Sequence, residues 1–163
     1  MKGKVMAFID RANTCGYIFP LAYFRENGIS DIDAFLKEYY FTGGHDAVVE
    51  DVLTKRADVG VVKNTVFDLL MESNPRVRSE LMIIAESSEF PTHGLFLRRD
   101  FNADVRRGLT EALLSMDKSP KGREVLKEFR ALKFIEADMH NDYKSVYEII
   151  NKAGIDLDTY DFN

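Results

Sequence analysis

The chain of 163 residues lacks several features that would assign it quickly to a class. It has one cysteine, Cys15, so no internal disulfide can form and cysteine content does not indicate a compartment. Its lysines and arginines are scattered and the formal net charge is −5, which argues against nucleic-acid binding. No apolar run approaches the roughly 18–20 residues of a membrane-spanning helix. The start, Met1–Lys4, carries no signal-peptide pattern.

Apolar runs and helical periodicity alternate over residues 1–90, with no linker or repeat between them. The expected elements are, in order, a strand at 4–9, helices at 15–27 and 31–37, a strand at 38–41, a helix at 44–56, a strand at 58–62, a helix at 65–72 and a strand at 81–85. Such alternation is typical of an α/β fold with a mainly parallel sheet covered by helices. We therefore expect residues 1–90 to form an α/β ligand-binding lobe.

The pattern changes after residue 90, and residues 91–163 are expected to form a separate segment that packs on the lobe or on a partner. The expected elements there are a strand at 94–97, helices at 102–116 and 120–131, a strand at 134–135 and a helix at 140–153. Gly154 is expected to cap the last helix. The acidic tail from residue 156 is expected to fray.

Three expected strands run directly into helices through short polar segments. These segments contain Asn13-Thr14-Cys15-Gly16, Gly43-Gly44-His45-Asp46 and Lys63-Asn64-Thr65. Ligands of open α/β sheets bind beyond the carboxyl ends of the strands, and helix N-termini there bind anions. The three junctions therefore predict an oxyanion site, although Asn13 or Thr14 could also be an ordinary N-cap. Gly43–Asp46 lacks the Lys-Ser/Thr pair of a nucleotide-binding P-loop.

The order of these motifs also resembles a known family. The run Gly3-Lys4-Val5, Asp10, Asn13-Thr14-Cys15-Gly16-Tyr17 and Pro20 is similar to the opening of one lobe in the substrate-binding proteins of phosphate, phosphite and phosphonate ABC transporters. The resemblance continues through Gly28-Ile29, Phe41–Ala47, Lys55–Val62, Asn64-Thr65-Val66 and Pro91–Arg98, and then through the helices around Leu113 and Gly122. It reaches to about residue 153.

The resemblance implies a periplasmic-binding-protein-like lobe of a two-lobed receptor that binds a phosphonate, phosphite or phosphate, without catalysis, cofactor or metal. It implies ligand contacts from two junctions, and Lys63 and Thr65 are expected to line the rim beside them. The expected ligand-binding residues are Asn13, Thr14, Cys15, Gly16, Tyr17, Gly44, His45, Lys63 and Thr65. The implied location is periplasmic or extracytoplasmic, and the implied partner is a transporter permease or sensor.

The chain departs from the family pattern at three of these positions. Asn13 and Cys15 stand where serines are usual, and a thiol is a poor donor. Lys63 stands where the family commonly has an aspartate that can receive a ligand's ammonium group. If Lys63 faces the cleft, it favours a plain or more anionic ligand over an aminoalkyl phosphonate; the alternative is that its side chain is solvated.

Family members usually carry a further lobe before this point, so the chain is expected to be an isolated lobe or a fragment of a longer protein. Two other functions stay open from the residues. The first is an enzyme with Cys15 and His45 as a nucleophile pair, since a helix N-terminus can activate a thiol. The second is an interaction module, in which a second copy or a partner protein covers the face left by the missing lobe.

Overall fold

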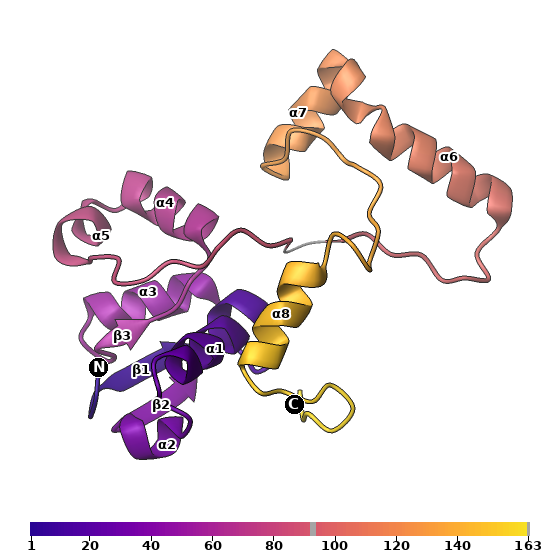
Figure 1. Cartoon of the computed structure of the whole chain (residues 1–163). Coiled ribbons are helices and arrows are strands. Elements are labelled where there is room, and N and C mark those ends of the chain that lie inside the picture. The colour runs from indigo at the N-terminus through magenta and orange to yellow at the C-terminus, as the bar shows by residue number, and fades with distance from the viewer. Residues whose placement is uncertain (92–93, 163) are drawn as a thin grey trace. The chain divides into compact units, whose positions relative to one another are not determined.

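The structure, a computed structural model, describes residues 1–91 and 94–162, and they form two units (Figure 1). Met1–Phe90 and the chain from Lys144 onward form unit 1, while Pro91–Tyr143 form unit 2. The expected division into a lobe over residues 1–90 and a further segment over 91–163 stays a prediction. In the structure the described chain after residue 143 groups with residues 1–90.

Unit 1 is built on a parallel three-stranded sheet in the order β2-β1-β3. The strands are β1 (Val5–Phe8), β2 (Glu38–Phe41) and β3 (Val59–Gly60). Met6 of β1 pairs with Tyr39 on one side and with Val59 on the other. Because all three strands run the same way, their carboxyl ends meet at one edge of the sheet.

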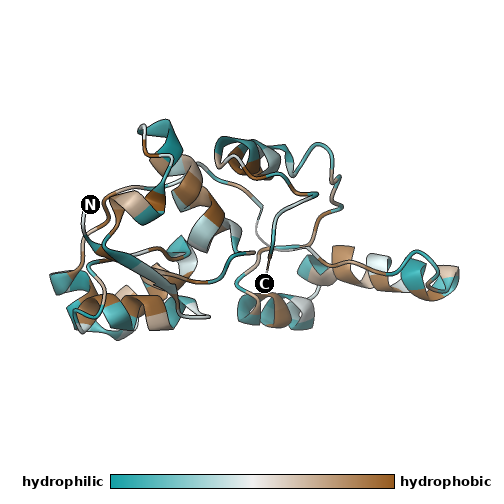
Figure 2. Cartoon of the chain, turned by 90° about the horizontal axis from the view of Figure 1, so that it is seen from below, coloured by the Kyte–Doolittle hydropathy of each residue, from teal (hydrophilic) through white to brown (hydrophobic). Residues whose placement is uncertain are grey.

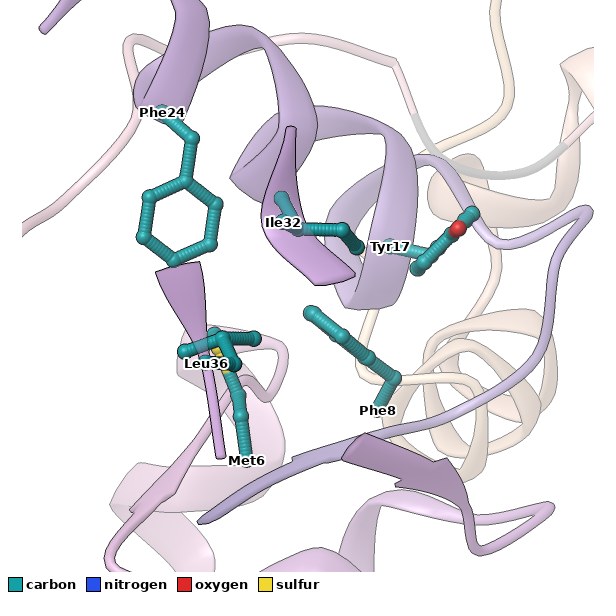
Figure 3. Close-up of a cluster of buried hydrophobic side chains, with 6 residues drawn as sticks. All are labelled: Met6, Phe8, Tyr17, Phe24, Ile32 and Leu36. Carbon is teal, nitrogen blue, oxygen red and sulfur yellow. The ribbon is translucent and has the colours of Figure 1, made fainter. Parts of the chain in front are cut away.

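Alternate residues of β1 face opposite sides of the sheet, as strand geometry requires. Met6 and Phe8 pack with α1 (Phe19–Glu26) and α2 (Ile32–Phe35), and Figure 3 shows this cluster. Ala7 packs on the other face with Val48 of α3 (His45–Leu53). Both faces of the central strand are therefore buried, which explains its nearly continuous apolar sequence.

Further helices cover α1 and α3 on their outer sides. A short π-helical segment, η1 (Thr14–Ile18), leads into α1, and both pack against α8 (Lys144–Lys152). The helices α4 (Asn64–Ser73) and α5 (Pro75–Glu80) pack against α3 through a cluster that includes Val49, Leu53 and Val77. The sequence did not predict α5.

The described residues of unit 2 form α6 (Ala103–Leu114), the 3₁₀ turn η2 (Met116–Lys118) and α7 (Pro120–Glu128), joined by chain without regular structure. Leu126 is the one large apolar side chain of its described residues that is fully buried. Leu132, Phe96 and Phe129 are 93%, 70% and 64% exposed. Figure 2 shows hydrophobic residues in brown on the helices of both units.

Three expected strands are wrong. Residues 81–85, 94–97 and 134–135 belong to no strand or helix. Their composition favours burial, but a strand also needs a neighbour for its backbone hydrogen bonds, and none lies beside them in the described chain. Met82, expected to be buried, is 80% exposed as a result.

The expectation that the acidic tail frays is also wrong for its described part. The carbonyl of Asp156 accepts hydrogen bonds from the N–H groups of Thr159 (3.2 Å) and Tyr160 (2.9 Å), which form a turn. Tyr160 is half-buried against the Met6–Phe8 cluster. The resemblance noted over Pro91–Arg98 crosses residues 92–93, which lie outside the described chain.

Candidate functional site

The first junction begins after β1 and is organised by Asn13. Its Oδ1 accepts hydrogen bonds from the N–H of Gly16 (2.8 Å) and from Sγ of Cys15 (3.2 Å). Asn13 is therefore an N-cap for η1, as the alternative interpretation of this residue predicted. The cap satisfies the Gly16 N–H, so the amides of Thr14 and Cys15 are the ones at this helix start that can donate to a ligand.

Gly16 and Tyr17 have structural roles in this junction. The side chain of Ile9 occupies the space that a Cβ atom on Gly16 would need, so η1 lies unusually close to the end of β1. Tyr17 is 5% exposed, and its ring meets the ring of Phe8 edge-on, with centroids 4.9 Å apart. Burial raises the pKa of Tyr17 to about 12, so its hydroxyl stays protonated.

The second junction follows β2 and turns sharply before α3. Thr42 and Gly43 donate backbone hydrogen bonds of 2.9 Å to the carbonyls of Phe8 and Ile9. Gly43 has φ +77°, a conformation that glycine adopts without strain, and Gly44 is the N-cap of α3 without a side-chain cap bond. His45 is the first residue of α3 and is half-buried.

The third junction meets the second directly. The backbone N–H of Lys63, the N-cap of α4, donates a 3.1 Å hydrogen bond to Nδ1 of His45. Because Nδ1 accepts this hydrogen bond, the neutral imidazole carries its proton on Nε2, which can then donate. This bond brings the starts of α3 and α4 together.

Lys63 also links the third junction to the first. Its positive charge acts on Cys15 and lowers the pKa of that thiol, but burial raises it more, so the net shift is upward. Cys15, His45 and Lys63 are thus neighbours at the carboxyl edge of the sheet. Thr65 lies one residue inside α4 and is exposed.

Arg11 is a further cation close to this edge, and the sequence reasoning did not select it. Its guanidinium carbon lies 5.4 Å from the ring centroid of Phe41, the last residue of β2. Arg11 also borders a hollow of about 280 Å³ beside α1 and α2, which is lined by Arg11, Tyr17, Leu21, Arg25, Ile29, Ser30, Ile32, Asp33, Tyr39 and Ala153. The sequence signal that could have identified Arg11 is its position shortly after β1, because an aromatic residue, Phe41, ends the neighbouring strand β2.

Residues 1–91 and 94–162 contain no group of three or more His, Cys, Asp or Glu side chains placed to hold a metal ion. Over the same ranges, no helix is both long and apolar enough to cross a membrane.

A comparison with protein families shows which known proteins the chain is related to. Residues 1–143 match the model of the family described as periplasmic substrate-binding proteins of phosphonate ABC transporters. The chain belongs to this family. Its likeness to curated proteins agrees: it is 25% identical over 157 residues to the probable ABC transporter phosphite-binding protein PhnD1 of Prochlorococcus marinus strain MIT 9301.

Solved structures show the same fold. Family member PhnD1 of Prochlorococcus marinus, in complex with methylphosphonate, superposes with a TM-score of 0.76 at 23% identity, over 94% of this chain and 58% of that one. A binding-protein component of a phosphonate ABC transporter from Pseudomonas aeruginosa gives a TM-score of 0.79 at 20% identity, over 93% and 50% of the two chains. The expected periplasmic-binding-protein-like α/β fold is therefore confirmed.

The chain spans about half the length of the curated relative it matches, covering 52% of that protein and 93% of itself. The matching relatives are binding components of transporters.

Proposed function

We propose that this chain binds a small phosphorus oxyanion at the carboxyl edge of its sheet, as a solute-binding component of an ABC transporter. The observation that carries the proposal is the hydrogen bond between the Lys63 N–H and His45 Nδ1. The bond joins the starts of α3 and α4, which carry the imidazole of His45 and the side chain of Lys63, and the charge of Lys63 acts on Cys15 at the first helix start. Backbone amides at helix N-termini, together with cationic side chains, are the groups that bind oxyanions in proteins.

Family membership supports the ligand class, and the methylphosphonate complex of the Prochlorococcus marinus protein supports it independently. The proposed donors are the amides of Thr14 and Cys15, the Thr14 hydroxyl, the imidazole of His45 and the ammonium of Lys63, with Gly44 and Thr65 at the rim. Asn13, Gly16 and Tyr17 are proposed to hold the first helix start in place, and so to act on the ligand through the position of the Thr14 and Cys15 amides.

These residues would enclose a ligand from one side, and affinity depends on how much of a ligand is buried. We expect a dissociation constant near 1 mM for this chain, equivalent to about −4 kcal/mol. A thermal-shift series with methylphosphonate, phosphite and phosphate tests this, because stabilisation grows with ligand concentration over the dissociation constant.

Two variants and one control make the test specific. His45→Ala should weaken oxyanion binding by about 10- to 100-fold, since a charge-assisted hydrogen bond contributes roughly 1.5–3 kcal/mol. Thr14→Val removes a hydroxyl and keeps the shape, and should weaken binding less. Lys2→Ala removes an exposed cation near the N-terminus and should leave binding unchanged. Equal affinity in His45→Ala and the parent chain would refute the proposed site.

The proposal assigns no catalysis to Cys15. Burial keeps its pKa high, whereas a nucleophilic cysteine needs a low one. Under this proposal Cys15→Ser leaves oxyanion binding intact or improves it, because serine is the better donor. A hydrolytic or transferase activity that disappeared in Cys15→Ser would favour an enzyme instead.

A second candidate function is an interaction module, and the exposed apolar side chains of unit 2 favour it. Surfaces with many exposed apolar residues commonly mark protein contacts. The proposed partner is a second copy of this chain. Sedimentation should then show a dimer that is indifferent to oxyanions, and Leu132→Lys should convert it to monomers. A monomer at every concentration would exclude this candidate.

A further inference from the structure

The last 19 residues of the described chain contact the first ligand-binding junction, although the family match ends at residue 143. Two contacts connect them. One is a buried apolar cluster between α8 and the helix that begins at Thr14. The other is a hydrogen bond from Tyr160 to the loop before that helix.

The apolar cluster fixes the position of the helix. Ile18 and Ala22 are 2% and 3% exposed, and they pack against Ile149, Ile150 and Ala153 of the C-terminal segment. An ion pair of 2.7 Å between Lys152 Nζ and Glu26 Oε1 lies at the far end of α1. The C-terminal segment thus holds η1 and the α1 helix that continues it, from Ile18 to Glu26.

The hydrogen bond fixes the loop. The hydroxyl of Tyr160 donates to the backbone carbonyl of Arg11 over 3.1 Å, in a half-buried position. Arg11 lies two residues before Asn13, whose side chain caps η1. The loop has other restraints as well, because the Asn13 N–H donates to the Asp10 carbonyl over 3.2 Å and Arg11 stacks on Phe41.

The tail is itself folded so that Tyr160 reaches this carbonyl. Asp156 Oδ1 accepts the N–H of Asp158 (3.0 Å), and its carbonyl accepts the N–H of Tyr160 (2.9 Å). The Tyr160 ring packs on the core cluster and meets the ring of Phe162 edge-on at 4.7 Å. Aromatic packing and the turn together place the hydroxyl.

From these contacts we infer that residues 144–162 form a C-terminal strap that positions the first junction for ligand binding, and that Tyr160 is its positioning residue. The inference rests on the proposed function for its effect on affinity. Its structural part does not, because the strap restrains Asn13–Gly16 whether or not a ligand is bound.

Cys15 supplies a readout for this restraint. It is the one cysteine of the chain, it lies inside η1, and its thiol donates to Asn13 Oδ1. Loosening the loop should expose the thiol to a disulfide reagent such as DTNB. The experiment measures the labelling rate of Cys15 in native buffer and in low urea, and the affinity for methylphosphonate and phosphite, in the same set of variants.

The decisive variant is Tyr160→Phe, which keeps the ring and deletes the hydroxyl. Deletion of residues 156–163 removes the tail. Leu157→Ala is the matched control, because Leu157 lies on the same tail and is 44% exposed outside the cluster. We expect Tyr160→Phe to label about fivefold faster and to bind about fivefold more weakly, the factor corresponding to one hydrogen bond. The deletion should change both the labelling rate and the affinity more than Tyr160→Phe does. Leu157→Ala should match the parent chain in both.

Each other outcome has a clear meaning. Unchanged labelling and affinity in Tyr160→Phe would overturn the strap. The strap would also be overturned if Cys15 of Tyr160→Phe labelled faster only in urea, and only by as much as the loss of global stability explains. Loss of a local restraint should instead expose Cys15 in native buffer. If no variant binds an oxyanion while Tyr160→Phe still labels faster, the proposed function fails and the strap stands.

Discussion

No Cβ atom fits on Gly16, because the side chain of Ile9 fills the space it would occupy. We expect Gly16→Ala to destabilise unit 1 by about 1–3 kcal/mol, the usual cost of overpacking. Urea denaturation followed by tyrosine fluorescence measures the change. Gly108→Ala in α6 is the matched control, because that position is open and a helix-interior alanine is favourable. A neutral Gly16→Ala would show that η1 can move away from β1.

Cys15 should react slowly at neutral pH. Burial raises the pKa of its thiol above the ordinary value of 9.0, so the thiolate is scarce until the solution is more alkaline than that. We expect iodoacetamide to alkylate native Cys15 more slowly than urea-unfolded Cys15 at pH 8, with a native rate that climbs steeply above pH 9. Fast alkylation of the native protein at pH 7 would revive the Cys15–His45 enzyme.

Asp58 should make the free energy of unfolding of unit 1 depend on pH in the acidic range. Hydrogen bonds from the Val5 N–H (3.0 Å) and Lys4 Nζ (3.1 Å) lower the pKa of Asp58 below its ordinary 3.8. Its stabilising contribution is therefore complete above about pH 4 and is lost as the pH falls through the lower native pKa.

Denaturation midpoints at pH 7 and pH 3 check this. Asp58→Asn should be less stable than the parent chain at pH 7 and should lose less stability on acidification. Asp68→Asn, an exposed carboxyl on α4, should not differ from the parent chain in this respect. An Asp58→Asn curve parallel to the parent curve would mean that the bonds to Val5 and Lys4 do not matter.

Lys63→Asp should change which ligand is preferred. An ammonium at the rim repels an aminoalkyl phosphonate, and a carboxylate in its place attracts that ligand's amine. We expect the ratio of affinities for 2-aminoethylphosphonate and methylphosphonate to rise about tenfold in Lys63→Asp, by calorimetric titration. Lys63→Ala should give an intermediate ratio. The same ratio in all three proteins would place Lys63 outside the site.

The parallel sheet and its polar edge followed from the sequence because they depend on local patterns. Val5–Phe8 is apolar throughout, and a strand buried on both faces requires this. The short polar segments after it and after Phe41 predicted strand-to-helix junctions, and these formed. The capping preference of small polar residues likewise indicated Asn13 or Thr14 as an N-cap, and Asn13 is the one that accepts from Gly16.

Features that depend on distant parts of the chain could not be predicted. The apolar run Leu81–Ala85 resembles a buried strand, yet whether it pairs is decided by the presence of a neighbour. Tyr160 and Arg11 are 149 positions apart, and no local pattern connects an acidic tail with a loop after the first strand. The Lys63–His45 bond depends on both junction turns and is visible only in three dimensions.

The central place of β1 in the order β2-β1-β3 has a consequence for synthesis on the ribosome. Both partners of β1 come later in the chain, so β1 leaves the ribosome without a neighbour and cannot form backbone pairs until β2 has emerged. The packing of α8 on α1 follows later still, because α8 lies far beyond α1 and the sheet strands in the sequence. The first helix start that we propose for oxyanions thus gains its support from α8 only after the sheet can form, and until β2 emerges a chaperone has an apolar strand to shield.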